Sequence, residues 1–163
     1  MTRRPDTTPM KQLPELRMLA ASAIDLTDKT YLLAPREEPP PQALVDSIRT
    51  YGILHPPLVQ QRKDREFIVI AGRKRLAAAL TLLRWEFVPC TVVPGSFSAP
   101  DLYALLLEHA LPSPPLSPSE QSLLFTNLCA TCETDAALPL LARLGYKENR
   151  HQLNELLALA KLT

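Results

Sequence analysis

The sequence predicts a small α+β domain followed by an all-helical region. Up to residue 93, short strand-like runs alternate with helical patterns, whereas the segments after residue 97 have the spacing of helices only. Prolines gather at 39–41 and 112–118 and mark joints between these parts. We therefore expect a flexible tail over 1–15, a mixed-sheet domain with flanking helices over 16–95, and a helical region over 96–163.

The composition indicates a globular protein. Of 163 residues, 46% are hydrophobic and 21% charged, and no apolar run approaches the roughly 18 residues of a membrane span. The polar N-terminus lacks the apolar segment of a secretory signal, so we expect a cytoplasmic location without a membrane partner. The net charge of +1 gives no overall attraction to nucleic acid, so any such binding depends on local clusters.

The first half combines two helices with three strand-like runs. A helix within 41–52 has apolar residues at helical spacing, with prolines before it and Gly52 after it. The runs 57–61 and 66–71 flank a polar turn and predict a hairpin or two neighbours in one sheet. A helical period begins at Gly72, and a further strand follows within 86–93.

The second half carries four helix starts. Ser98 with Asp101, and Ser117 with Glu120, are N-terminal capping patterns. A third helix opens at 134 or 135 and closes at Gly145, and a fourth opens at 149. The last two have the spacing of a helix-turn-helix near 136–162. The start of a recognition helix reaches base edges. The candidate DNA-binding residues are Asn149, Arg150, His151, Gln152 and Asn154.

Three cations stand where the helix after the second strand begins: Arg73, Lys74 and Arg75. Because a helix N-terminus is partly positive, each should destabilise the helix by a few tenths to ~1 kcal/mol. They become favourable if a phosphate lies between them and the unpaired backbone N–H groups that follow Gly72. The alternative is a solvated basic helix start without function, and the pattern alone leaves both open.

Residues 34–93 resemble the N-terminal domain of the ParB/sulfiredoxin superfamily. ParB-like members carry a Pro-Arg element, then S-I-x-x-x-G-I-L-x-P, a strand, and G-E-R-R-x-x-A-A. The corresponding pieces here are Pro35-Arg36, "SIRTYGILHP" at 47–56 and "GRKRLAAA" at 72–79. The C-terminal "RLGYKENRHQLNELLALAKLT" is similar to the helix-turn-helix of the same family and the helix that closes it.

The resemblance implies a site for CTP and a homodimer formed by clamp closure. In the family, the arginine-rich helix start holds the nucleotide phosphates, and the G-I-L-x-P element lines the nucleoside. The implied phosphate ligands are Gly72, Arg73, Lys74 and Arg75, and the implied pocket wall is Arg36, Gly52, Leu54 and His55. The resemblance also implies DNA as a partner, in partition or in regulation.

Two departures argue against catalysis. The acidic residue that follows the glycine in the family is Arg73 here, so a carboxylate implicated in hydrolysis is replaced by a cation. The element similar to E-N-L-Q-R-x-x-L-x-P falls on "EHALPSPPLSP" at 108–118, and prolines supply no side-chain oxygen for Mg²⁺. We therefore expect no catalytic residue, no metal site, and at most weak CTP hydrolysis. A sulfiredoxin would need a reactive cysteine at position 73.

Other interpretations concern a different activity or local motifs. A ParB-like nuclease would need a carboxylate cluster for metal-assisted cleavage, and none stands out. The third interpretation is a module that docks to a protein partner and has lost both the nucleotide site and the DNA-binding site. Cys129 and Cys132 lack the other ligands of a zinc site and are better explained by core packing. His109, beside Glu108, is expected to be surface or core decoration rather than an acid–base group.

Overall fold

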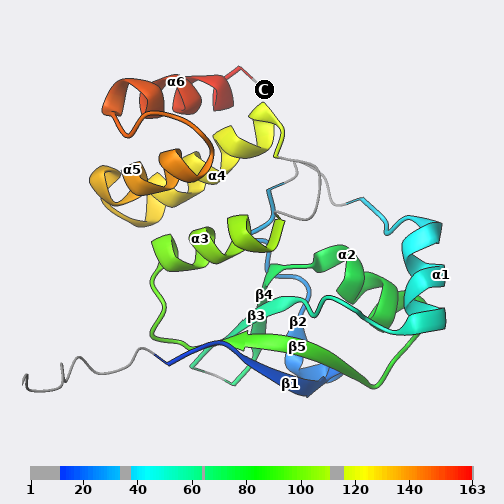
Figure 1. Ribbon diagram of the computed structural model, residues 1–163. Helices are drawn as coiled ribbons and strands as arrows, with labels where there is room; N and C mark the ends of the chain where they lie inside the picture. The colour runs from blue at the N-terminus through cyan, green and yellow to red at the C-terminus, as the bar shows by residue number, and fades with distance from the viewer. Residues whose placement is uncertain (1–11, 34–37, 64, 111–115, 163) are drawn as a thin grey trace, which may run out of the picture.

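We analysed a computed structural model that describes residues 12–33, 38–63, 65–110 and 116–162. Its first part is a mixed sheet with helices packed against it, and its last part contains helices only (Figure 1). The strands are β1 (Glu15–Ala20), β2 (Ile24–Asp25), β3 (Leu58–Gln61), β4 (Phe67–Ala71) and β5 (Phe87–Val93), in the spatial order β1-β5-β3-β4-β2. The expected fold class is confirmed.

The pairing of the strands shows how the segments predicted as strands are arranged in the sheet. β3 and β4 pair antiparallel, as a hairpin. β5 lies parallel to β3 on one side and antiparallel to β1 on the other, and β2 is parallel to β4. The sequence reading did not predict β1 or β2. β1 begins at Glu15, the last residue assigned to the tail, while residues 1–11 lie outside the described part of the chain.

The helices begin close to the residues that predicted their starts. They are α1 (Gln42–Tyr51), α2 (Arg73–Leu76), α3 (Ala99–Ala110), α4 (Pro118–Thr131), α5 (Thr134–Arg143) and α6 (Arg150–Ala160), with a 3-10 turn η1 (Ala21–Ala23). α2 continues directly into a π-helical segment, η2 (Ala77–Leu82). Ser117 and Glu120 form a reciprocal capping box at α4. The Asn149 side chain accepts a hydrogen bond from the Gln152 backbone N–H at 2.8 Å.

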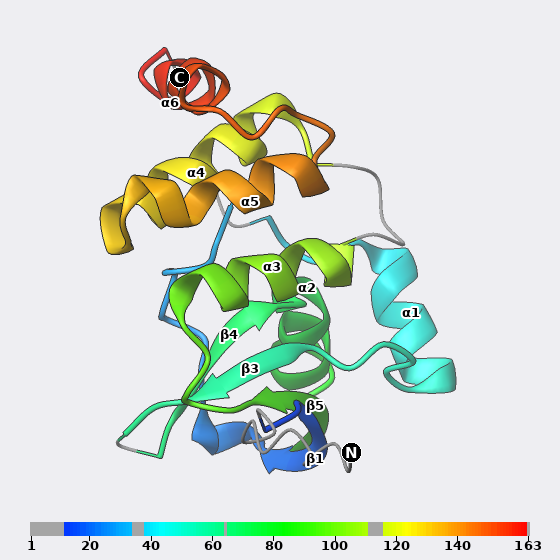
Figure 2. The same ribbon diagram turned by 60° about the vertical axis from the view of Figure 1, so that its left-hand side comes forward.

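Two hydrophobic clusters lie on opposite faces of the sheet. In one, Val45 and Ile48 of α1 pack with Leu76 of α2 and with Val59 and Val69 of the sheet. The other cluster includes the opposite sheet face and side chains of α3, α4, α5 and α6. Figure 2 shows α3 between the sheet and the pair α4 and α5. The helical region therefore shares a core with the sheet, through α3.

The described residues include no helix with the length and apolar character needed to cross a membrane. The three cysteines are free, and Cys90 is buried in the sheet. Burial raises the pKa of the Cys90 thiol to about 12. Within the described ranges, no group of three or more His, Cys, Asp or Glu side chains is placed to hold a metal ion.

Candidate phosphate and nucleotide site

Gly72 connects β4 to α2 through a left-handed backbone conformation. Its φ is +90°, and a Cβ added there would lie 2.8 Å from Cβ and 2.9 Å from Cα of Pro57. No L side chain fits this space without a shift of backbone, because real Cβ atoms do not approach backbone so closely. The glycine thus lets the helix start lie directly against the chain entering β3.

Arg73 joins the helix start to the segment after β2. Its Nη1 donates a hydrogen bond to the Leu26 carbonyl oxygen at 2.7 Å, and its Nη2 donates to the carbonyl oxygen of Asp28. The side chain is half-buried. Two carbonyl dipoles therefore hold this cation in place, which explains one of the three basic residues without any ligand.

Arg75 points the other way, toward the loop before β3 and toward α3. Its Nη1 donates to the His55 carbonyl oxygen, and its Nη2 lies 3.3 Å from each ring nitrogen of His109. Burial lowers the pKa of Arg75, yet a guanidinium remains charged in a protein. Arg75 therefore contacts two segments distant in sequence, one before β3 and one on α3.

His109 lies in this site, where the sequence reading had expected surface or core decoration. Its Nε2 is 3.2 Å from the Pro56 carbonyl oxygen. A neutral ring that donates from Nε2 to Pro56 and accepts at Nδ1 from Arg75 satisfies both contacts. Burial lowers the pKa of His109, and the Arg75 cation and His55 lower it further. No local motif marks His109, because its partners come from other parts of the chain.

Lys74 is the most exposed of the three cations. Its Nζ lies 3.6 Å from a Glu38 carboxylate oxygen, and half of its side-chain surface is accessible. An ion pair this open is worth little in water. Unlike the two arginines, Lys74 has an ammonium that solvent or a ligand can reach.

The cations border a cavity of about 650 Å³ between α2, α3 and the start of α4. Apolar side chains form part of its wall, among them Leu33, Leu44 and Leu106. Of the residues assigned to nucleotide binding, five line the cavity: Gly72, Arg73, Lys74, Arg75 and His55. His109, Glu108 and Glu120 line it as well. The cavity is thus cationic on the α2 side, and the rest of its wall combines apolar side chains with two carboxylates.

The remaining assigned residues are placed elsewhere or are not described. Gly52 and Leu54 are not among the residues that line the cavity, and the Leu54 side chain is 69% exposed. Gly52 ends α1 with a φ of +77°. Arg36 lies outside the described residues, as do residues 111–115 of the second motif. The nucleoside wall therefore has one assigned residue in place, His55.

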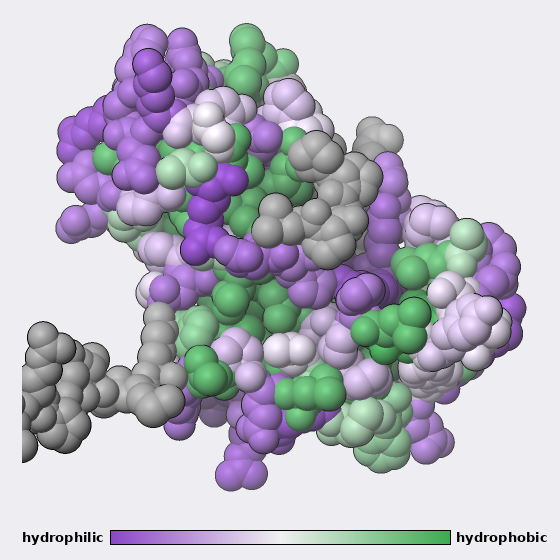
Figure 3. All heavy atoms as spheres, viewed as in Figure 1, coloured by the Kyte–Doolittle hydropathy of each residue, from purple (hydrophilic) through white to green (hydrophobic). Residues whose placement is uncertain are grey.

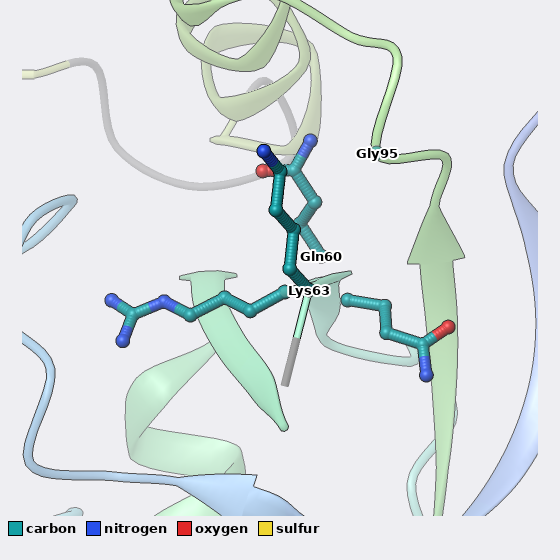
Figure 4. Close-up of a pocket in the computed structure, with 5 residues that line it drawn as sticks. Gln60, Lys63 and Gly95 are labelled. Atoms are coloured by element: carbon teal, nitrogen blue, oxygen red, sulfur yellow. The ribbon is translucent and has the colours of Figure 1, made fainter. Parts of the chain in front are cut away.

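A second hollow, of about 490 Å³, lies beside the β3–β4 turn (Figure 4). Gln60, Gln61, Arg62, Lys63 and Gly95 line it, and Figure 4 shows Gln60 and Lys63 beside the chain at Gly95. The Gln60 amide donates to the Pro94 carbonyl oxygen at 3.1 Å, and Arg62 pairs with Asp28. Since Gln60 and Arg62 already bond within the protein, the cavity over α2 is the better candidate site.

The candidate DNA-binding residues lie at the start of α6, and acidic side chains accompany most of them. Arg150 is 2.8 Å from an Asp135 carboxylate oxygen, and His151 is 3.3 Å from Glu155. Gln152 donates to the same Glu155 at 2.9 Å, and the Asn149 side chain caps the helix. Asn154 is exposed. The basic groups at this helix start are therefore already partly neutralised.

Comparison with known proteins identifies the family of the domain. A sequence model of the ParB N-terminal domain family matches residues 15–108, more than half of the chain. The chain belongs to this family. Nucleoid occlusion proteins of Bacillus cereus and Halalkalibacterium halodurans are each 41% identical over 51 residues, or 31% of this chain. The matched segment covers 17% of the length of each relative.

Solved structures of ParB proteins are similar over most of the chain. A Pnob8-like ParB-N domain aligns over 82% of this chain and 50% of its own, with 14% identity and a TM-score of 0.54. The C-terminally truncated ParB from Caulobacter crescentus complexed with CTP-gamma-S covers 82% and 73%, with 19% identity and a TM-score of 0.46. The Pnob8-like domain shares the fold of this ParB-like chain.

Proposed function

We propose that this ParB-like chain binds a nucleotide through the cavity over α2 and associates with DNA through its helical region. The observation that carries the nucleotide part is the reachable Lys74 ammonium beside Gly72 and Arg75, at the edge of a cavity of about 650 Å³. A volume of this size is typical of sites for small molecules and cofactors. The apolar part of the wall suits a base, and the cationic α2 side suits its phosphates.

The charges of the site favour binding of phosphate but not its transfer. Arg75 uses part of its five N–H donors on His55 and His109, so others can reach a phosphate. Glu108 and Glu120 oppose a polyanion, although Glu108 is paired with Arg143. Arg73 is held by backbone carbonyls at the position of the family's acidic residue. We therefore propose binding without hydrolysis.

Calorimetric titration with CTP, ATP and pyrophosphate tests the nucleotide proposal. Lys74→Gln should raise the Kd about tenfold, because it removes one charge-assisted contact and no buried group. Lys63→Gln, at the second hollow, is the matched control and should leave the Kd unchanged. CTP is the first nucleotide to test, since it is the one that the family resemblance implies. Absence of heat with all three ligands would overturn the proposal.

DNA association is proposed for α5 and α6, arranged as a helix-turn-helix. It is supported by the polar, exposed start of α6 and by family membership. Fluorescence anisotropy with a labelled duplex at 50 and 200 mM salt would measure it, since phosphate contacts weaken steeply with salt. Arg150→Ala should weaken binding several-fold, with Arg49→Ala on α1 as control. Equal affinity of both variants would remove α6 from the interface.

The family resemblance also implies a homodimer that closes around DNA when nucleotide binds. Under this proposal, CTP raises the fraction of dimer, and Lys74→Gln prevents the increase. Sedimentation velocity with and without CTP, at a concentration where the nucleotide-free chain is mostly monomeric, measures this directly. A dimer fraction that is the same in both conditions would contradict nucleotide-controlled closure while leaving nucleotide binding intact.

A further inference from the structure

Strand β1 forms one edge of the sheet. Its six residues pair with β5 on one side, and within the described part of the chain no other strand lies on its outer side. In Figure 1, β1 lies at the lower margin of the molecule, away from the helical region. An edge strand presents unpaired N–H and C=O groups that can pair with another strand.

The backbone groups that face outward can be assigned from the register. Ala21 N–H donates to the Glu86 carbonyl oxygen at 2.8 Å, which continues the β1–β5 pairing. Because alternate residues of a strand face opposite neighbours, Glu15 and Arg17 face β5, whereas Leu16 and Met18 face outward. The N–H and C=O groups that point away from β5 therefore include those of Leu16 and Met18.

The same stretch carries uncovered apolar side chains. Leu16 and Met18 are each 63% exposed, and Phe87, opposite Ala20 on β5, is 57% exposed. Directly paired residues project to the same face of a sheet, so these three side chains share one face. Figure 3 shows separate hydrophobic patches among hydrophilic side chains in the lower part of the molecule. Exposed apolar side chains on an unpaired edge indicate an interaction surface.

We propose that the partner of this edge is a second copy of the chain, paired antiparallel through β1 about a two-fold axis at Leu16. In this register the Leu16 residues of the two copies lie opposite each other. Glu15 of each copy lies opposite Arg17 of the other, so the pair occurs two times. A two-fold interface must be self-complementary, and the segment Glu15-Leu16-Arg17 meets this condition in both charge and hydrophobicity.

The geometry of pairing strengthens the choice of register. Glu15 and Arg17 would form non-hydrogen-bonded pairs, in which opposed side chains are closest. Centring the axis on Arg17 would instead oppose two arginines. The Arg17 guanidinium carbon lies 5.8 Å from the Phe67 ring centroid, but the residue is exposed, as is Glu15. No β1 residue lines the cavity over α2, so this interface is separate from the nucleotide site.

Sedimentation equilibrium of the full chain without nucleotide tests the proposal. The wild type should dimerise, and Glu15→Arg or Arg17→Glu alone should weaken the dimer at least tenfold, because each places like charges opposite one another. The double variant E15R/R17E should restore it. A monomer at 200 µM, or a dimer indifferent to all three variants, would overturn the proposal; circular dichroism checks that each variant folds.

Disulfide formation gives an independent test of the register. A hydrogen-bonded antiparallel pair has Cα atoms about 5.5 Å apart, within the range that a disulfide spans. In a background with Cys129 and Cys132 changed to Ser, Leu16→Cys should therefore cross-link into a covalent dimer on oxidation. Met18→Cys is the matched control, since two copies of Met18 would lie roughly 13 Å apart. Faster cross-linking of Met18→Cys would overturn the assigned register.

Discussion

Two glycines with nearly the same φ differ in what surrounds them. Gly72 has a φ of +90° and packs on Pro57, whereas Gly145 has a φ of +84° and, chain neighbours aside, no atom of the described residues within 4 Å of an added Cβ. Gly145→Ala should cost about 1 kcal/mol, the price of a left-handed conformation. Gly72→Ala should cost roughly 2–4 kcal/mol, since the clash adds to that strain. Urea unfolding of both variants measures the difference, and equal costs would show that the Pro57 contact relaxes freely.

His109 should make stability depend on pH. Folding lowers the pKa of its ring below the ordinary 6.5, chiefly through burial. As pH falls below 6.5, the unfolded chain binds more protons at this site than the folded protein, so the folded state loses stability. His109→Gln removes this titration and should lose less stability than the wild type between pH 7.5 and 5.5.

The control for that measurement is His151→Gln, which changes an exposed histidine on α6. Urea unfolding of the wild type and both variants at the two pH values gives the six free energies needed. If His109→Gln loses as much stability on acidification as the wild type, the contacts of the ring with Arg75 and Pro56 do not distinguish its two protonation states.

At the scale of single elements, the start of α4 depends on its capping box. Ser117 Oγ accepts from the Glu120 N–H at 3.2 Å, and Glu120 accepts from the Ser117 N–H at 2.7 Å. Ser117→Ala should lower the free energy of unfolding by about 1 kcal/mol. Ser119→Ala, an exposed first-turn serine without this role, should change it by only a few tenths. Equal effects would mean that the cap adds nothing.

The sequence predicted the elements that carry strong local signals. The helix ended by Gly52, the hairpin and the capped helices of the second half are present because turn and capping residues act locally. β1 escaped prediction because its alternation is short: Glu15 to Met18 alternate polar and apolar residues, but Leu19 and Ala20 break the pattern. The structure also shows a π-helical segment after α2 that helical periodicity did not indicate.

The candidate site was predictable only in part, because some of its contacts join segments that are distant in the sequence. The resemblance identified the Gly72–Arg75 segment as a unit, and these residues do border one cavity. It did not indicate that Arg73 and Arg75 are held by carbonyls of other segments, nor that His109 contacts Arg75. Such contacts depend on how distant parts of the chain pack, which spacing along the sequence does not contain.

At the scale of the whole molecule, α3 links the sheet to the helical region. Leu102 of α3 is 2% exposed and belongs to a cluster that contains Ile70 of β4 as well as Phe125, Leu141 and Leu153 of the later helices. Since one core crosses the boundary near residue 95, the two regions should stabilise each other. A nucleotide bound between α2, α3 and α4 would therefore affect the position of the helices that follow.

A shared core predicts a single unfolding transition. Trp85 packs against the cluster on the other face of the sheet, so its fluorescence reports on the first region, while far-UV circular dichroism is dominated by the helices. Both probes should give one midpoint, and Leu102→Ala should shift both by the same amount, at a cost of roughly 2–5 kcal/mol. Leu82→Ala, at a side chain 54% exposed, is the control and should shift neither appreciably. If Leu102→Ala shifts the midpoint measured by circular dichroism but not the midpoint measured by Trp85 fluorescence, the helical region unfolds independently. In that case α3 does not couple the stability of the helices to that of the sheet.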